Sequence, residues 1–538
     1  MDGHAVDGHG GRLAVEVLKA HGVDVMFTLS GGHLFVLYDG AVQADLRLVD
    51  VRHEQTATFA AEGYAKVTRK LACAALTAGP GITNGVSAMT AAKMNGSPLV
   101  VLGGRAPQLR WGSGSLQELD HVPIVAPVTK TAATATSPES IVAEVAAACT
   151  AAQTPHRGPT FVDIPLDAFG PGSAEIGAQT IRAVEPDGDA IATIAALVRE
   201  AECPVLMAGG DIYWAHAEGP MVAFAEAARV PVFVNGMGRG SIPADHELSF
   251  SRARSVALKQ ADLVLVAGTP LDFRLGFGRF GDAKVVHLCD AASEVAPHAT
   301  LAASTAGDLA QTFAGLAEKA GGGQHDDWIG QLRADENAKR AAEGPGLEAD
   351  TAPIKPARIY GELRKRLDRD AIVIGDGGDF VSYAGKLIES FTPGTFLDPG
   401  PFGCLGMGPG YALAAAVAHP DRQIVLLLGD GAIGFALGDF EALIRHGANV
   451  TAIVGNNGIW GLEKHPMQAL FGYDVVAELS PGIRYDQVIE ALGGHGQLVT
   501  EPGDLGAALD RAFATKGVSL VNVLTDPADA YPRSSNLA

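Results

Sequence analysis

Short runs of apolar residues recur along the chain, and most of them end in glycine. In the first third these runs lie at 24–32, 71–79, 97–105 and 160–167. A helical pattern, GRLAVEVLKAHGV (11–23), precedes the first run. Runs of Val, Leu and Ile of this length predict buried strands, and the 3.6-residue periodicity between them predicts helices. The pattern therefore predicts an α/β fold built on parallel sheets.

The same alternation returns twice more, which predicts three doubly wound parallel-sheet domains. The second set of runs lies at 203–210, 230–238, 261–268 and 283–290, and the third at 370–378, 423–431, 450–458 and 519–526. We place the domains at 1–175, 187–345 and 354–538. The Gly/Pro-rich stretch 169–179 is expected to be a connector. The charged segment 319–353 is expected to form a surface helix and a linker.

Composition and charge narrow the classes of function. The chain has 538 residues, of which 47% are hydrophobic, and its formal net charge is −21. A chain of this composition can bury large cores. Its acidic surface repels nucleic acid, so we do not expect nucleic acid as a partner. Five cysteines without a CxxC pair argue against a zinc site or a disulfide framework and favour a reducing compartment. We find no leader or membrane-span pattern and expect a cytoplasmic protein.

Polar side chains follow two strands of the third domain at the point where each strand ends. Asp430 lies between two glycines in LLLGDG, and Asn457 closes the next strand in VGNN. The carboxyl ends of consecutive parallel strands lie side by side, so these two side chains are expected to converge. Carboxylate, amide and backbone carbonyl oxygens suit Mg²⁺, and the glycines let backbone N–H groups approach phosphates. The spacing predicts a Mg²⁺–diphosphate site.

This GDG…NN pattern resembles the cofactor motif of the thiamine diphosphate (ThDP) dependent enzymes. The resemblance covers roughly residues 11–530 and implies pyrimidine-binding, central and diphosphate-binding domains. It implies metal ligation by Asp430, Asn457 and the carbonyl of Ile459. Asp430 and Glu54 would act on one ThDP from different subunits, in a homodimer or a dimer of dimers. An inactive partner subunit that keeps this fold is the alternative class, and the presence of Glu54, Asp430 and Asn457 argues against it.

Further segments match motifs of the same family. RHE (52–54) implies a catalytic Glu54 that hydrogen-bonds the pyrimidine ring, SGGH (30–33) a glycine loop with His33 at the substrate, and TAGPGITNG (77–85) a second loop. The third domain implies Leu405 as the apolar wedge beneath the bent cofactor. The other cofactor-binding residues implied are Gly31, Gly32, Asn84, Gly377, Gly378, Asp379, Gly406, Met407, Gly431, Ala432 and Gly461.

Two reactions fit the resemblance. One is acetolactate (acetohydroxyacid) synthesis from two 2-ketoacids, for which Gln117 and Lys130 would lie near the active site. However, Pro466 stands where the synthases have a tryptophan that selects the second ketoacid, and Glu463 stands where they have an apolar residue. A glutamate there resembles the 2-hydroxyacyl-CoA lyases, so we expect cleavage of a 2-hydroxyacyl-CoA to formyl-CoA and an aldehyde or ketone, with acetolactate synthesis as the alternative.

We also expect the central domain to bind a nucleotide. RARSVALKQADLVLVAGTPLDFRLGFG (252–278) resembles the nucleotide-binding stretch of the lyases and of oxalyl-CoA decarboxylases. It implies that Arg252, Arg254 and Arg274 contact phosphates of ADP or CoA, or of FAD in the synthase branch. The substrate would accordingly be a small molecule, either an acyl-CoA or a 2-ketoacid.

Overall fold

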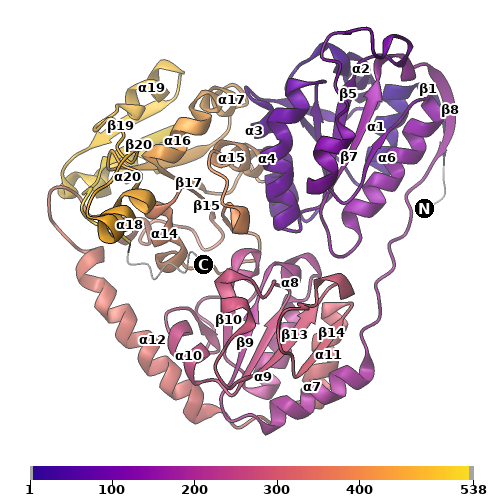
Figure 1. Ribbon diagram of the computed structural model, residues 1–538. Helices are drawn as coiled ribbons and strands as arrows, with labels where there is room; N and C mark the ends of the chain where they lie inside the picture. The colour runs from indigo at the N-terminus through magenta and orange to yellow at the C-terminus, as the bar shows by residue number, and fades with distance from the viewer. Residues whose placement is uncertain (1–3, 532–538) are drawn as a thin grey trace.

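The structure, a computed structural model that describes residues 4–531, contains three six-stranded sheets and a two-stranded ribbon (Figure 1). All strand pairs in the three large sheets are parallel, as predicted. Residues 1–3 and 532–538, which the expected domain limits include, lie outside the described residues. Within residues 4–531, no helix combines the length and apolar character needed to cross a membrane.

The first sheet has the strand order β3-β2-β4-β5-β7-β6 and helices on both faces. Its strands are β2 (Val25–Thr28), β3 (Arg47–Asp50), β4 (Ala72–Leu76), β5 (Leu99–Arg105), β6 (Ala132–Thr134) and β7 (Pro159–Pro165). Its helices are α1 (Gly10–Ala20), α2 (Phe35–Gln43), α3 (Glu54–Thr68), α4 (Pro80–Met94), α5 (Val122–Val125) and α6 (Pro138–Gln153). Neighbouring residues of β2 face different cores: Phe27 packs with α3 and α4, and Met26 with α1, α2 and α6.

The central sheet has the different order β11-β10-β9-β12-β13-β14. Its strands are β9 (Pro204–Ala208), β10 (Val232–Val234), β11 (Ser249–Phe250), β12 (Leu263–Ala267), β13 (Lys284–Cys289) and β14 (Ala303–Ala306). Its helices are α7 (Gly188–Glu200), α8 (Gly210–Trp214), α9 (Glu218–Ala228), α10 (Arg254–Gln260) and α11 (Leu309–Lys319).

The third sheet, β16-β15-β17-β18-β20-β19, repeats the topology of the first. Its strands are β15 (Ile372–Asp376), β16 (Phe396–Leu397), β17 (Ile424–Gly429), β18 (Val450–Asn456), β19 (His495–Val499) and β20 (Val518–Leu524). Its helices are α13 (Pro356–Leu363), α14 (Asp379–Leu387), α15 (Gly408–Ala418), α16 (Asp430–Ala436), α17 (Phe440–Arg445), α18 (Gly461–Phe471), α19 (Tyr485–Ala491) and α20 (Leu505–Ala514). The strand order reverses between β15 and β17, and open α/β sheets bind ligands at this point.

The apolar runs predicted the inner strands, whereas five of the six edge strands had no such signal; the sixth, β3, lies in the run LRLVDV (46–51). These five are β6, β11, β14, β16 and β19, most of them short, and each contacts only one neighbouring strand in its sheet. The stretch 169–179, expected to be a connector, instead contains strand β8 (Pro171–Ile176), which pairs antiparallel with β1 (His4–His9). Half-exposed and edge strands need few apolar residues, so their sequences resemble loops.

Helices α3 and α15 join the first domain to the third within one chain. Gly63 and Gly410 permit the close approach, because a Cβ on Gly63 would lie 2.9 Å from the Tyr411 Cα, and one on Gly410 3.0 Å from the Phe59 Cβ. Beside this crossing the buried Lys66 ammonium contacts the Glu62 carboxylate at 3.0 Å and the Tyr411 hydroxyl at 2.8 Å. The two domains therefore share one continuous hydrophobic core.

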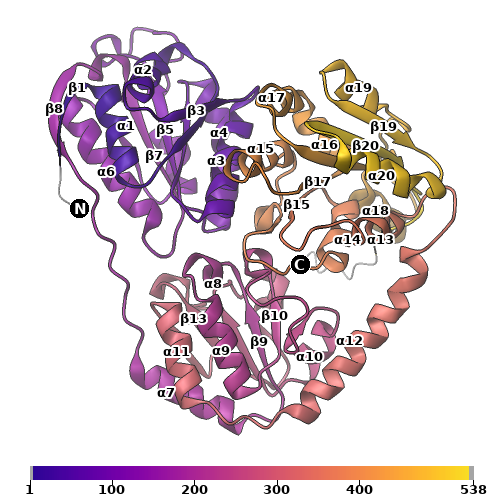
Figure 2. The same ribbon diagram turned by 180° about the vertical axis from the view of Figure 1, so that it is seen from behind.

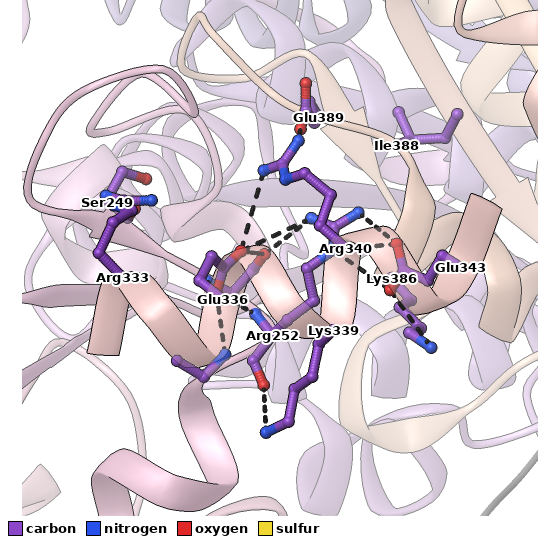
Figure 3. A network of polar contacts seen from close by, with 12 residues as sticks. Ser249, Arg252, Arg333, Glu336, Lys339, Arg340, Glu343, Lys386, Ile388 and Glu389 are labelled. Atoms are coloured by element: carbon purple, nitrogen blue, oxygen red, sulfur yellow. Dashed lines mark hydrogen bonds and ion pairs between the residues drawn. The ribbon is translucent and has the colours of Figure 1, made fainter. Parts of the chain in front are cut away.

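The charged segment predicted as a surface helix is α12 (Asp326–Leu347), which runs along one side of the molecule from the central to the third domain (Figures 1 and 2). One of its faces is not solvated. Glu336 is buried and accepts hydrogen bonds from the backbone N–H groups of Ser251, Arg252 and Ala253. Glu343 binds Arg252 of the central domain and Lys386 of the third (Figure 3). This helix fixes the two domains relative to each other.

We expect Glu336→Ala to lower the free energy of unfolding by about 3–5 kcal/mol, because it leaves one buried and two partly buried N–H groups and part of the Arg252 charge unpaired. Chemical denaturation measures this change. Glu318→Ala, on the exposed face of α11, is the control and should change stability by less than about 0.5 kcal/mol. Equal stabilities of the two variants would contradict this role for Glu336.

Candidate active site

The predicted pair of side chains meets at the carboxyl edge of the third sheet. The Asp430 carboxylate is buried and accepts hydrogen bonds from the N–H groups of Gly458 (2.6 Å) and Gly431 (3.0 Å). Burial raises the pKa of Asp430 to about 6, although these backbone donors act in the opposite direction. Asn457 turns its amide oxygen toward the N–H of Ile459 at 3.2 Å. The loop after β18 is thus folded around the carboxylate of β17.

These residues line one cavity of about 460 Å³. It also contains most of the third-domain residues predicted to bind the cofactor, together with Glu463 and Trp460. The predicted lining residues are Gly377, Gly378, Asp379, Leu405, Asp430, Gly431, Ala432, Asn457, Ile459 and Gly461. The central domain contributes Asn235, Gly236 and Arg274 to the wall. The cavity lies at the point of strand-order reversal, between β15 and β17.

The chemistry of the lining fits a magnesium diphosphate. Asp430 and Asn457 carry oxygen donors, and Ile459 adds its backbone carbonyl. Within residues 4–531, Asp430 forms hydrogen bonds but no ion pair, so a buried carboxylate remains without a cation. Gly377 adopts a φ of +140°, and a Cβ on Gly378 would lie 2.6 Å from Leu462. Because these glycines have no side chains, phosphate oxygens can approach the backbone there.

Asp376 is a residue of this site that the sequence analysis missed. Its fully buried carboxylate, at the end of β15, accepts hydrogen bonds from the N–H groups of Gly406 (3.0 Å) and Gly408 (2.7 Å). It therefore holds the segment that carries Leu405 and Met407. Burial raises the pKa of Asp376 to about 7. The available signal was a second Gly-Asp-Gly, at 375–377, on the strand next to β17.

The predicted first-domain residues form a second group at the edge of their own sheet. Glu54 is the first residue of α3, and its carboxylate accepts a hydrogen bond from the Asn84 amide at 3.0 Å. A Cβ on Gly81 would lie 3.5 Å from Glu54 Oε1, and one on Gly31 would overlap Thr77. The second glycine loop therefore lies against the Glu54 carboxylate, and the first packs on the second through Gly31 and Thr77.

His33 and Gln117 lie against these loops. His33 is buried with its Nδ1 3.4 Å from the Thr77 hydroxyl. Burial, with a further contribution from His121, lowers the pKa of His33, so the imidazole is neutral at pH 7. Gln117 has a φ of +58° and covers Gly79. By contrast, Lys130 donates to the carbonyls of Thr154 and His156, away from Glu54.

His121 is a second residue that the sequence analysis missed. Its buried imidazole accepts a hydrogen bond from the N–H of Gly79 at 2.9 Å and contacts the Asp163 carboxylate at 2.8 Å. Asp163 also binds Arg105 at 2.8 Å. Because Nε2 accepts, Nδ1 carries the proton toward Asp163. This chain of contacts fixes the loop that precedes Gly81, beside Glu54.

Among residues 4–531, the first-domain group does not line the Asp430 cavity of its own chain. The cavity at Asp430 has no first-domain residue in its wall. Hydrogen bonds between the domains surround Glu54: Gln55 donates to the Leu405 carbonyl at 3.4 Å, and Asp439 of the third domain accepts from the Arg52 N–H (2.9 Å) and the Thr56 hydroxyl (2.8 Å). The third domain of the same chain thus positions the Glu54 segment without presenting Asp430 to it.

The three predicted phosphate-binding arginines differ in their environments. Arg252 is buried and bidentate on Glu343, so its charge is already neutralised. Arg274 pairs with Asp272 and lines the Asp430 cavity. Burial, and then the neighbouring Arg274, lower the pKa of Arg254, which donates to the Arg274 carbonyl. All three line a separate cavity of about 1320 Å³.

Comparison with protein families matches the three domains separately. Residues 8–124 match the N-terminal TPP binding domain of thiamine pyrophosphate enzymes. Residues 191–316 match the central domain of these enzymes, and residues 376–523 match their C-terminal TPP binding domain. Thiamine pyrophosphate (TPP) and thiamine diphosphate are the same compound. Both groups of predicted residues therefore lie in regions that match TPP binding domains.

Full-length relatives carry two kinds of name. The chain is 55% identical over 537 residues to the acetolactate synthase large subunit of Mycobacterium tuberculosis, with 98% of each chain covered. It is 33% identical to 2-hydroxyacyl-CoA lyase 2 of Caenorhabditis elegans, over 97% of this chain and 90% of the relative. It is 31% identical to 2-hydroxyacyl-CoA lyase 2 of Homo sapiens, over 92% of this chain and 86% of the relative.

The buried Asp376 predicts a specific pH dependence of stability in protein without added cofactor. Its folded-state pKa of about 7 lies above that of an exposed aspartate, so the folded state binds more protons, and stability falls as pH rises from 4 to 7. The unfolding free energy of the wild type minus that of Asp376→Asn should fall by about 1.4 kcal/mol for each unit by which the pH rises. Denaturation at pH 5 and pH 6.5 measures the slope. Parallel profiles would show that this carboxyl does not carry the effect.

Proposed function

This chain belongs to the thiamine pyrophosphate enzymes, and we propose that it joins two 2-ketoacids with release of CO₂, as an acetolactate synthase does. The observation that carries this proposal is the 55% identity over 98% of both chains to a relative of that name. The lyase reaction, which the sequence alone favoured, is named for relatives of 31–33% identity. A long alignment without large gaps supports the same domains and the same cofactor geometry.

The third domain would hold the diphosphate end of the cofactor. Asp430, Asn457 and the Ile459 carbonyl would bind Mg²⁺, and the glycine-rich ends of β15 and β17 would approach the phosphates. Leu405 would support the cofactor from below, and Asp376 would keep Leu405 in place through Gly406 and Gly408. When bound, thiamine diphosphate supplies an electron sink for the carbon whose bond is formed or broken.

Glu54 would hold and move a proton at a ring nitrogen of the pyrimidine. Its position at the start of α3 and its hydrogen bond from Asn84 orient the carboxyl for that contact. The neutral His33 and Gln117 line the neighbouring loops, where an imidazole or amide N–H can donate a hydrogen bond to a ketoacid carboxylate or carbonyl. None of these three groups lines the Asp430 cavity of its own chain.

We therefore also propose that each active site combines Glu54 of one subunit with Asp430 of another. The separation of the two groups within one chain supports this, as does the shared core of α3 and α15, which prevents the first domain from moving over the Asp430 cavity. A homodimer is the smallest assembly that completes two such sites. A dimer of dimers would also complete such sites.

Two observations favour a second candidate function, the cleavage of a 2-hydroxyacyl-CoA. Glu463 lines the Asp430 cavity, where a carboxyl group can transfer a proton to or from a bound substrate. Arg274 lines both this cavity and the 1320 Å³ cavity, whose wall also carries Arg254, Lys259 and Arg279. Such a positively charged space beside the site suits the phosphates of CoA, or of ADP or FAD bound by the central domain.

Product analysis separates the two reactions. With thiamine diphosphate, Mg²⁺ and pyruvate, we expect acetolactate and CO₂ in equal amounts. With a 2-hydroxyacyl-CoA under the same conditions, we expect no formyl-CoA. Formyl-CoA production without acetolactate would reverse the order of the two candidates. Glu463→Gln is informative in either case, because the lyase reaction should lose about 10²-fold or more in kcat and acetolactate synthesis much less.

A hybrid of two inactive variants tests whether the site crosses the subunit boundary. Glu54→Gln should lose roughly 10²–10⁴-fold in kcat, and Asp430→Ala should lose metal and cofactor binding. Co-expression with two different tags yields dimers with one chain of each kind. If Glu54 and Asp430 come from different chains, one of the two sites is intact and the hybrid has about half the wild-type activity. A hybrid as inactive as its parents would place both residues of each site in a single chain.

A further inference from the structure

A second cluster of possible metal ligands lies outside the proposed active site. His156 precedes β7 in the first domain, Asp211 lies in α8 and Asp290 follows β13. One nitrogen or oxygen from each residue lies within 4.8 Å of the other two. The cluster thus joins the first domain to the carboxyl edge of the central sheet, on the side where α8 faces the first domain (Figures 1 and 2).

We infer that His156, Asp211 and Asp290 bind a divalent transition-metal ion, such as Zn²⁺. The distances suit such an ion: His156 Nδ1 lies 3.2 Å from Asp290 Oδ1 and 3.4 Å from Asp211 Oδ1. Two ligands about 2.1 Å from one ion lie about 3.0 Å apart in an octahedron and about 3.4 Å apart in a tetrahedron. One imidazole and two carboxylates favour zinc or manganese over Mg²⁺.

Burial gives this cluster a reason to bind a cation. Asp211 and Asp290 are both buried, and Asp290 Oδ2 has no hydrogen-bond partner among residues 4–531. The Arg157 guanidinium is 3.9 Å from that oxygen, which is too far for a hydrogen bond, and its nearest nitrogen is also unpaired. Two adjacent buried carboxylates are costly unless a positive charge bridges them.

The cluster opens on a cavity that can complete the coordination. This cavity of about 450 Å³ is lined by His156, Asp211 and Glu294, and by residues of all three domains. Water or a carboxylate can reach the remaining positions of the ion from this side. Asn235, Gly236 and Arg274 line both this cavity and the Asp430 cavity. A metal here would fix the first domain against the central domain without touching the cofactor.

Zinc titration of the holoenzyme tests this site. The protein, loaded with thiamine diphosphate in millimolar Mg²⁺, is titrated with Zn²⁺ against a chromogenic chelator. We expect one tight Zn²⁺ per wild-type chain, bound about 100-fold more weakly by Asp290→Asn and by His156→Gln. The tight Zn²⁺ should persist in two controls: His495→Gln at an exposed histidine, and Asp430→Asn at the proposed magnesium site, which is titrated without thiamine diphosphate. Bound Zn²⁺ should also raise the melting temperature of the wild type but not of Asp290→Asn.

Two results would overturn the inference. One is a wild-type chain that binds no tight Zn²⁺, which would mean that a protonated His156 and the nearby Arg157 guanidinium are enough to balance the two carboxylates. The other is Zn²⁺ binding that Asp290→Asn and His156→Gln leave unchanged. If Asp290→Asn fails to fold, as its burial allows, His156→Gln provides the comparison, because the His156 side chain is 25% exposed.

Discussion

The buried carboxylate of Asp430 is the interaction on which the rest of the site depends. It lies where β17 ends, and the N–H groups of Gly431 and Gly458 hold its oxygens, so the loops after β17 and β18 fold around one negative charge. Burying that charge costs free energy, and a bound cation would recover it. Asn457 and Ile459 lie in the wall of the same cavity, within the segment that matches a TPP binding domain.

The inner strands and the glycine-rich strand ends could be predicted because their signals are local. An apolar run that ends in glycine, with one polar residue after it, identifies both a buried strand and its functional tip. The edge strands, such as β11 and β16, gave no such signal because one of their sides has no partner strand. The strand β8 looked like a connector for the same reason: it pairs with only one strand, and several of its residues are exposed.

Supporting residues could not be predicted, because their partners are distant in sequence. Asp376 holds Gly406 and Gly408, some 30 residues away, and Asp439 holds Arg52 and Thr56 across nearly 390 residues. The ion pair of Arg252 could not be predicted either, because its partner Glu343 lies on α12, some 90 residues away in sequence. The sequence identified residue types at strand ends, whereas the tertiary fold determined which charges remain available.

Above all, we propose that Asp430 and Asn457 hold a divalent cation against the diphosphate of the cofactor. Electron–nuclear double resonance of protein with one equivalent of Mn²⁺ and thiamine diphosphate tests it most directly. We predict a strong ³¹P coupling to Mn²⁺ that disappears in Asp430→Asn. A wild-type spectrum without ³¹P coupling, or an unchanged spectrum in Asp430→Asn, would contradict the claim.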